Sequence, residues 1–301
     1  MKTIVSQLTV AGLLSLCATS TAVLAASVVQ PGETVGISVG APLKPGFHFV
    51  NATNWGCRNT SPSKTCIGAD YPIIAWSTPW QPLNARLQFI VSLPVAELEI
   101  VHVYSAHGLY NPFFAGQLAW KLGNGWNFSY LLSTHTDIRS DVAWNSTSLN
   151  QGFALSYVAD GWNLTANLIY GINFPHVSSR PQLSPCPPLG TTGCNPDFLN
   201  IDLTATKKFG DLEIGAVGFG SMDLNQPVPV YAKQSQFAIG GLIGYDFGKI
   251  EWQGYITRDV YERNYGGKDL RGWMRLLVRL GDPFAPEPAP SSAFPVKAAR
   301  K

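Results

Sequence analysis

The feature that most constrains this chain is a two-residue alternation of side-chain character along several segments. In 162–172 every second residue is apolar, and the residues between them include Asn163, Thr165 and Asn167. The same alternation recurs in 198–206 and, with an exception at Gln151, in 149–157. A period of two places successive side chains on opposite faces of an extended backbone, so these segments predict half-buried β-strands rather than helices.

The apolar residues are dispersed instead of concentrated in long runs. The longest candidate for a spanning helix, 87–103, is broken by Ser92, Pro94, Glu97 and Glu99, and a spanning helix needs about 20 apolar residues. Charged residues make up only 13% of the chain, against about 25% in an ordinary soluble domain. A closed barrel is the other structure that satisfies every backbone group in lipid. The predicted fold class is therefore all-β, a transmembrane antiparallel up-and-down β-barrel of about 12 strands.

The connections between these segments alternate in length. Short Gly- and Asp-containing turns occur at 123–125, 159–161, 208–211 and 247–249, and longer polar stretches lie at 134–148, 175–197, 223–233 and 258–268. Barrels in the outer membrane have short periplasmic turns and long external loops. Aromatic pairs flank three of the tight turns, as expected of an interfacial girdle: Trp120 with Trp126, Tyr157 with Trp162, and Tyr245 with Trp252. An exported β-sandwich would also alternate, but it does not explain this sorting of loops and aromatic residues.

The chain divides into four predicted regions. Lys2, the apolar run 4–16 and a cleavage site ending at Ala25 predict a cleaved signal peptide over 1–25 and export to the outer membrane of a Gram-negative bacterium. Residues 26–45, with three prolines and several glycines, predict a periplasmic lead-in or a partial plug. Residues 46–280 form the predicted barrel, and 281–301, rich in Pro and Ala, a flexible periplasmic tail.

The first strands are expected near 46–55, 70–80 and 84–93. Segment 94–111 allows two readings, a further strand or an extension of the previous one. An even strand count places both termini in the periplasm. It also places the four cysteines that remain after residue 25 in external loops, in two close pairs: Cys57 with Cys66, and Cys186 with Cys194. In an oxidising compartment such pairs predict two local disulfides, and without a C-x-x-C spacing they do not predict a zinc site.

Longer stretches resemble a known family. These are FLNIDLTATKKFGDLEIGAVGFGSMDL at 198–224, YAKQSQFAIGGLIGYDFG at 231–248 and TRDVYERNYGGKDLRGWMRL at 257–276. They are similar to the transporter-like family of the MetA-pathway of phenol degradation, and the resemblance covers most of 42–280. It implies an outer-membrane channel for aromatic or other hydrophobic compounds. The chain departs from the expected pattern in its tail after Leu280 and in its two cysteine-closed loops.

If the apolar faces meet lipid, the alternate residues line the interior. The predicted lumen-lining set is Arg86, Gln88, Asn127, Ser129, Asn163, Asn167, Asn200, Asp202, Glu213, Glu251, Gln253, Arg271, Arg275 and Arg279. The apolar stripe formed by every second residue from Leu270 to Leu280 directs the last three arginines inward. These charges would either guide solutes through a polar lumen or form an internal latch, with the arginines paired to Glu213, Glu251 and Asp202.

The predicted function is an outer-membrane channel for passive uptake of small hydrophobic or aromatic compounds. One alternative is a non-transporting surface or structural barrel whose working parts are loops 56–69 and 174–197. A less favoured one is an outer-membrane hydrolase, since the chain contains no G-x-S-x-G, H-E-x-x-H or P-loop. No catalytic residue, metal or cofactor is expected. The expected partners are outer-membrane lipid, the solutes and the barrel assembly machinery, and no basic cluster suggests nucleic acid.

Overall fold

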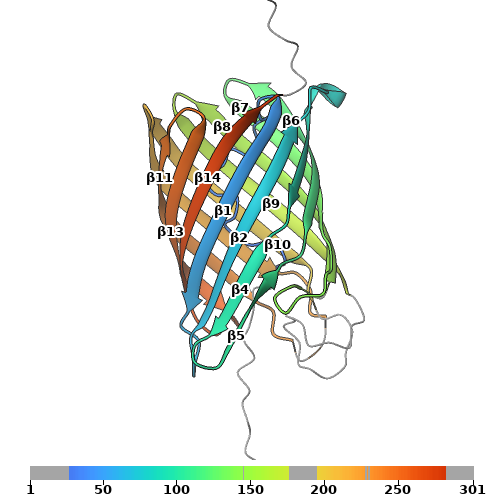
Figure 1. Ribbon diagram of the computed structural model, residues 1–301, viewed down its shortest axis with the longest axis vertical. Coiled ribbons are helices and arrows are strands. Elements are labelled where there is room, and N and C mark those ends of the chain that lie inside the picture. Colours follow the sequence, from blue (N-terminus) through green and yellow to red (C-terminus); the bar gives the residue numbers. More distant parts are fainter. Residues whose placement is uncertain (1–26, 145, 176–194, 228, 230, 283–301) are drawn as a thin grey trace, which may run out of the picture.

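The strands form one antiparallel sheet that closes on itself (Figure 1). The computed structural model describes residues 27–144, 146–175, 195–227, 229 and 231–282. The strands are β1 (Gly46–Arg58), β2 (Thr65–Ser77), β3 (Arg86–Ser92), β4 (Val95–Ile100), β5 (Tyr104–Leu109), β6 (Phe113–Gly123), β7 (Trp126–His135), β8 (Ser146–Ala159), β9 (Trp162–Pro175), β10 (Phe198–Phe209), β11 (Leu212–Asp223), β12 (Ser235–Asp246), β13 (Ile250–Arg263) and β14 (Asp269–Gly281), and a 3-10 turn, η1 (Pro82–Asn84), follows β2.

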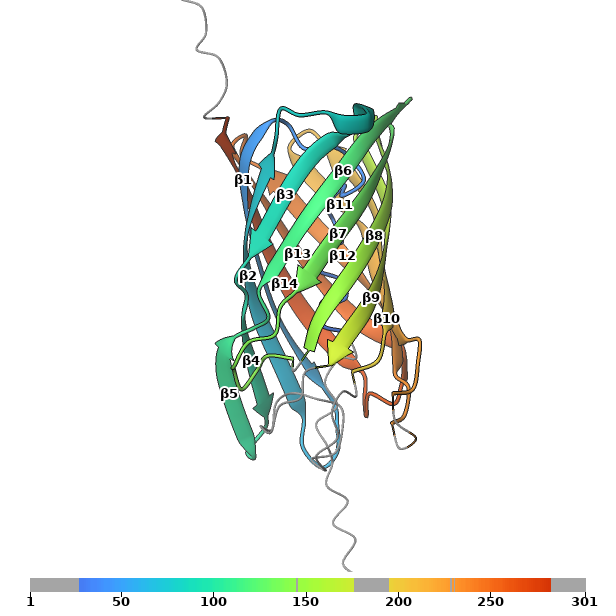
Figure 2. The same ribbon diagram turned by 90° about the vertical axis from the view of Figure 1, so that its right-hand side faces the viewer.

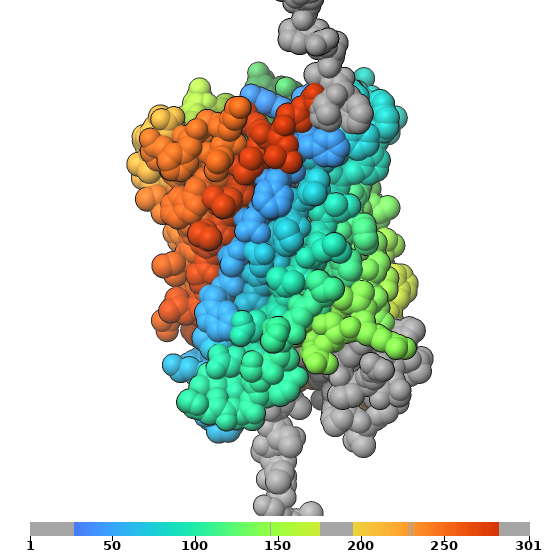
Figure 3. Space-filling model, viewed as in Figure 1, coloured from blue at the N-terminus to red at the C-terminus, as the bar shows by residue number. Residues whose placement is uncertain are grey.

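Each strand of the barrel pairs with its neighbour in the chain, and β1 pairs with both β2 and β14. The ring therefore has 12 strands, with β4 and β5 outside the count. The predicted fold class is confirmed. Figure 3 shows β14, β1 and β2 as a continuous wall, and no helix in the described part of the chain has the length and apolar character to cross a membrane.

Segment 94–111 extends an existing strand instead of adding one to the ring. Strand β3 pairs with the end of β2 at 73–77, and β4 continues along β2 at 65–70 after an interruption at Leu93 and Pro94. Strand β5 then returns beside β4 and leads into β6. Proline has no backbone N–H to donate to a neighbouring strand, which is consistent with the interruption at Pro94. The β4–β5 hairpin projects from the end of the barrel that carries the long loops, hereafter the long-loop end (Figure 2).

The alternation in the sequence separates an outer from an inner face. Leu164 and Leu168 are exposed, whereas their neighbours Thr165 and Asn167 are buried within the barrel. Every barrel strand carries at least one exposed large apolar side chain, and on β10 this is Phe209 at the end of the strand. So broad an apolar surface is suited to lipid. A cluster of three polar side chains on β1 and β2 interrupts this apolar surface: Asn51 Nδ2 and Thr53 Oγ1 donate to Asp70 at 2.9 and 2.6 Å.

Aromatic side chains gather at the opposite end, hereafter the short-turn end. Trp126 lies 5.2 Å from Tyr157 between ring centroids, and the rings of Phe47, Trp76 and Trp80 form a second group. The short turns therefore carry the aromatic girdle that the sequence indicates. Such girdles occur at both membrane interfaces, and it is the short length of the turns that is typical of the periplasmic end.

Several strands are longer than predicted, which corrects two loop assignments. Strand β1 continues to Arg58 and β2 begins at Thr65, so Cys57 and Cys66 lie on paired strands and not in a loop. Strand β13 continues to Arg263, so the predicted loop 258–268 shrinks to 264–268. Backbone pairing continues beyond the lipid boundary, where outward side chains need no longer be apolar. The predicted signal peptide at 1–25, nearly all of the tail, and the Cys186–Cys194 pair lie outside the described residues.

Candidate functional site

Residues 27–45, hereafter the strap, run through the interior of the barrel before β1 begins (Figure 2). Asn200, near the long-loop end of β10, donates to Ser27 Oγ at 2.9 Å and to the Val29 carbonyl at 3.1 Å. At the short-turn end, the Leu43 amide donates to Gln88 Oε1 at 3.1 Å. The strap therefore extends from one end of the lumen to the other. The start of β1 and the end of β14 lie together at the short-turn end, the end predicted to face the periplasm, whereas Ser27 lies at the opposite end.

The first half of the strap is held by a carboxylate on β10. Asp202 accepts hydrogen bonds from the Gly32 amide at 2.8 Å, the Thr34 amide at 3.0 Å and the Thr34 hydroxyl at 2.6 Å. Asn167 of β9 donates to the same hydroxyl at 2.9 Å. Thr204 accepts from the Gly36 amide at 2.7 Å. Peptide N–H groups facing a buried carboxylate make charge-assisted hydrogen bonds, which are among the stronger ones in proteins.

The opposite side of the same stretch is held by Arg275. Its side chain, only 1% exposed, donates to the carbonyls of Val35 at 2.7 Å and Glu33 at 2.5 Å. It also contacts Gln253 Oε1 at 2.9 Å and the Tyr255 hydroxyl at 3.0 Å. Arg275 thus binds strap carbonyls, and it does not form the predicted pair with Glu213, Glu251 or Asp202.

The second half of the strap contacts the other side of the barrel. Gln117 and Ser129 both donate to the Val39 carbonyl at 2.9 Å, and the Gly40 amide donates to Ser156 Oγ at 3.0 Å. Asn163 and Gln253 share the Gly36 carbonyl, each at 3.1 Å. The polar side chains of the wall are therefore largely engaged by strap backbone.

Two glycines allow the strap to lie this close to the wall. Gly32 and Gly36 have φ angles of +89° and +84°, a region that side chains with a Cβ rarely adopt. A Cβ on Gly32 would lie 2.5 Å from the ring of Phe219, and one on Gly36 would lie 2.6 Å from Leu242. Both positions therefore require glycine for conformation and for space.

A cavity of about 610 Å³ lies beside the strap. Its far wall is formed by inward-facing apolar side chains of β1, β2, β3, β6, β7 and β9, namely Val50, Ile73, Ile90, Phe113, Leu131 and Ile169. Ile37, Val39 and Leu43 line it from the strap. This size is within the range of small-molecule sites, which are mostly apolar with few polar groups.

This apolar wall was not predicted from the sequence, because apolar residues were assigned to lipid and polar residues to the lumen. A usable sign was present: each of the six residues adjoins another large apolar residue, as in Ile73-Ile74, Leu131-Leu132 and Leu168-Ile169. In a strand only one member of such a pair can face lipid. Doubled apolar residues therefore mark places where the lumen too is apolar.

The cavity meets solvent at the short-turn end, where exposed Lys44, Lys249 and Arg279 line it. Lys208 there contacts Glu251 at 3.2 Å and Asp246 at 3.7 Å. Both pairs are partly exposed, so solvent weakens them and they contribute little to stability. Arg279 has no side-chain hydrogen bond or ion pair within the described part of the chain. Several charged side chains therefore lie at the opening, while Glu33 and Asp202 line the cavity farther in, on the side of the strap and β10.

The long-loop end of the cavity is closed by a buried apolar cluster: Val28, Val29, Leu98, Trp144, Ile169 and Phe198. Trp144 belongs to residues 136–144, hereafter the lid, which lie over this end of the lumen beside β5. Asn111, fully buried, holds the lid by accepting from the Trp144 amide at 2.7 Å and donating to the carbonyls of Trp144 and Thr136 at 2.9 and 3.0 Å. The lid is thus held by Asn111 together with the burial of Val142, Ala143 and Trp144 and the hydrogen bond from the Asp137 amide to Thr147 Oγ1 at 3.2 Å.

A second loop at this end is held by a buried hydroxyl. Tyr231 donates to Asp223 Oδ2 at 2.5 Å, and the Gln234 amide donates to the same oxygen at 2.6 Å. Burial, together with the neighbouring Asp223 carboxylate, raises the pKa of the Tyr231 hydroxyl far above its ordinary value. The hydroxyl therefore stays protonated and keeps donating to Asp223.

The predicted lumen residues fall into three groups. Those that line the cavity are Ser129, Asn163, Asn167, Asn200, Asp202, Glu213, Glu251, Gln253 and Arg279. Gln88, Asn127, Arg271 and Arg275 are buried elsewhere in the interior. Arg86 lies at the rim, where it donates to the Thr78 carbonyl at 2.8 Å. Contact of any of them with a transported solute stays a prediction.

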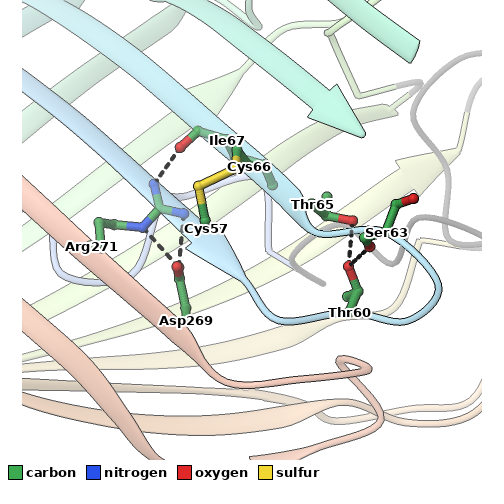
Figure 4. Close-up of a disulfide and its surroundings, with 8 residues drawn as sticks. All are labelled: Cys57, Thr60, Ser63, Thr65, Cys66, Ile67, Asp269 and Arg271. Atoms are coloured by element: carbon green, nitrogen blue, oxygen red, sulfur yellow. Dashed lines mark hydrogen bonds and ion pairs between the residues drawn. A yellow bond between two sulfur atoms is a disulfide. The ribbon is translucent and has the colours of Figure 1, made fainter. Parts of the chain in front are cut away.

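Arg271 belongs to a network at the long-loop end of the seam between β1 and β14. It contacts Asp269 at 2.8 Å, the Ile67 carbonyl at 3.0 Å and Asn54, and Cys57 and Cys66 form a disulfide beside it (Figure 4). Arg58 forms a second buried pair with Asp259 at 2.9 Å. The acidic partners come from the strand ends and not from the predicted Glu213, Glu251 and Asp202, because those three lie nearer the middle or the other end of the barrel.

Among the described residues, no group of three or more His, Cys, Asp or Glu side chains is arranged to hold a metal ion. The histidines are spread over separate places: His48 at the short-turn end, His135 at the end of β7, and His102 and His107 on the β4–β5 hairpin.

The fold is shared with a solved outer-membrane channel. The chain is similar to the COG4313 outer membrane channel from Pseudomonas putida F1, with a TM-score of 0.62 and 10% identity over 83% of this chain and 99% of that one. More distant similarities are to the NanC porin, at a TM-score of 0.47 and 15% identity over 76% and 98% of the two chains, and to the Pseudomonas putida toluene transporter TodX, at 0.39 and 11% over 85% and 96%. No curated protein sequence matches the chain.

The apolar outer face, the girdle and the shared fold place this chain in the bacterial outer membrane. A family model matches residues 50–276, which is most of the barrel. By that match, the chain belongs to the family described as "Putative MetA-pathway of phenol degradation".

Proposed function

We propose that this chain is an outer-membrane channel for passive uptake of small hydrophobic or aromatic compounds. The observation that carries the proposal is the apolar cavity between the strap and the wall of β1–β3, β6, β7 and β9, which opens at the short-turn end. Burying apolar surface of a solute against this wall is favourable by about 25 cal/mol per Å². The family description, which concerns phenol degradation, supports an aromatic solute.

A hydrophilic solute would gain little from this cavity. Along the apolar wall, beyond the charged opening, Gln117, Ser129, Asn163 and Asn167 already donate to the strap, so a sugar or amino acid there would find few free partners on the barrel wall. Each solute hydroxyl buried without a partner costs about 1–3 kcal/mol. The site therefore favours molecules with few hydrogen-bonding groups.

Passage also requires the closed end to open. The buried cluster around Trp144 stands between the cavity and the long-loop end, and three hydrogen bonds of Asn111 hold the lid there in addition to that burial. We propose that movement of the lid connects the cavity with the outside. The predicted export signal at 1–25, the tail, and insertion by the barrel assembly machinery belong to the same proposal.

Uptake by a strain that lacks this chain tests the proposal. Entry of phenols should slow relative to the parent strain and recover when the wild-type gene is restored, whereas glucose uptake should stay the same. Uptake is measured for a set of phenols and fatty acids. If the strain that lacks the chain takes up every one of them as fast as the parent strain, the proposed channel is refuted. Transport without chemistry is also proposed, so ester and peptide substrates incubated with the detergent-extracted protein should remain intact.

A further inference from the structure

We propose that the strap is the specificity-determining element of this channel, because it covers the polar part of the barrel interior and leaves a path along the apolar wall. The inference rests on the proposed channel function and names the part of the molecule that selects the solute. It assigns residues 27–45 a role in selection in addition to filling space.

Half of the lumen is closed by packing against the strap. Val35 lies fully buried in a cluster with Val217, Phe219, Leu242, Tyr255 and Trp273, together with Ala238, on β11–β14. Tyr255 and Trp273 stack at 5.1 Å between ring centroids, and the Tyr255 hydroxyl donates to the Gly32 carbonyl at 3.1 Å. This packing fills the lumen around Val35, and the open space lies mainly between the strap and the apolar wall.

The strap also satisfies the polar groups of the wall. Asp202, Asn167 and Asn163 of the β9–β10 region face it, as do Gln117 and Ser129 from β6 and β7. Without the strap these side chains would line a wide, water-filled lumen, as in a general porin. With it, their donors and acceptors are occupied by peptide groups of the chain itself.

The strap contributes the near wall of the remaining path. Ile37, Val39 and Leu43 line the cavity opposite Val50 and Leu131. A solute in the cavity is therefore bounded by apolar side chains on both sides, and replacing one on the strap should alter selection without touching the barrel. Ile37 is suited to this purpose because no side-chain hydrogen bond depends on it.

Two variants in lipid vesicles test the inference against the wild type. In the first, residues 27–41 are deleted; in the second, Ile37→Asn, the strap is kept. Glu97→Gln, on the exposed face of the β4–β5 hairpin, is the matched control. Entry of phenol and of arabinose is measured for each, and slower gel migration after boiling shows that the barrel was folded.

The deletion should raise arabinose entry by about tenfold or more, because a lumen with free polar groups no longer rejects hydroxyls. Ile37→Asn should raise the ratio of arabinose to phenol entry severalfold, and Glu97→Gln should match the wild type. A folded deletion variant that excludes arabinose as well as the wild type does would overturn the inference, as would an unchanged ratio in Ile37→Asn. If the deletion does not fold, Ile37→Asn decides alone. Wild-type vesicles that admit phenol no faster than protein-free vesicles would instead refute the proposed function, so the two failures are distinguishable.

Discussion

Replacing Asp202 by asparagine should detach the first half of the strap while the barrel stays intact. The carboxylate accepts three hydrogen bonds, from the amides of Gly32 and Thr34 and from the Thr34 hydroxyl. Asparagine has one acceptor oxygen, and its second terminal atom is an NH₂ group. If that oxygen keeps the bond to Gly32, the NH₂ group faces the Thr34 amide, from which it cannot accept, and the Thr34 hydroxyl, which can no longer donate to it.

The loss can be estimated from those two bonds. Hydrogen bonds to charged groups contribute about 1.5–3 kcal/mol each, and removing the charge weakens the third. Because the lumen admits water that partly replaces the lost partners, we expect the lower end of the range, about 3 kcal/mol. At 1.4 kcal/mol for each factor of ten, the strap should open about a hundredfold more often.

Hydrogen exchange followed by mass spectrometry measures this opening directly. Peptides containing Gly32, Thr34 and Gly36 should exchange about a hundredfold faster in Asp202→Asn than in the wild type, and peptides from β8 and β9 should be unchanged. Asp70→Asn is the matched control, since Asp70 binds Asn51 and Thr53 on the outer face and contacts no strap atom. Equal protection of the Thr34 amide in a folded Asp202→Asn barrel would show that Asp202 does not hold the strap.

Three further predictions concern the lid, the disulfide and the outer face. Asn111→Ala removes the hydrogen bonds that hold Trp144, so phenol entry should rise severalfold and the lid should become sensitive to limited proteolysis. Entry rates and a digestion pattern equal to those of the wild type would contradict the role of the lid. Replacing Cys57 and Cys66 by serine should lower the free energy of unfolding, measured by urea titration in lipid, by about 2–3 kcal/mol. This is the loop-closure entropy that a disulfide removes from the unfolded chain for a loop this short, and no decrease would argue against a stabilising bond. Leu168→Arg places a charge towards lipid and should cost about 2–4 kcal/mol in the same titration, and a neutral result would mean that this face does not meet lipid.

Period-two patterning was sufficient to predict the barrel, because in lipid the outer face of every strand must be apolar whatever the lumen contains. Leu164, Leu168 and Leu203, on the outside of β9 and β10, meet that requirement. Strand ends were less predictable, as at Arg58 and Arg263, because pairing in water places no constraint on side-chain polarity.

The sequence left two readings for residues 26–45, a lead-in or a partial plug, because the position of the strap depends on contacts far apart in the chain. Nothing in the local pattern around Thr34 indicates that its partners are Asp202 and Asn167. Hydrogen bonds made by backbone atoms leave little trace in residue type, apart from glycines such as Gly32 and Gly36. The apolar stripe from Leu270 to Leu280 was sufficient to predict that the arginines of this strand point inward. Which acceptor each arginine contacts depends on strand register and on the strap.

The position of Ser27 has a practical consequence for handling the protein. A purification tag or reporter fused directly ahead of this residue would begin near the cell-surface opening of the barrel, whereas one joined after Asp282 would begin on the cell's inner side, beside the end of β14. A folded reporter is too wide to be drawn through a lumen that already holds the strap. Labels added at the two ends should therefore report on opposite sides of the outer membrane.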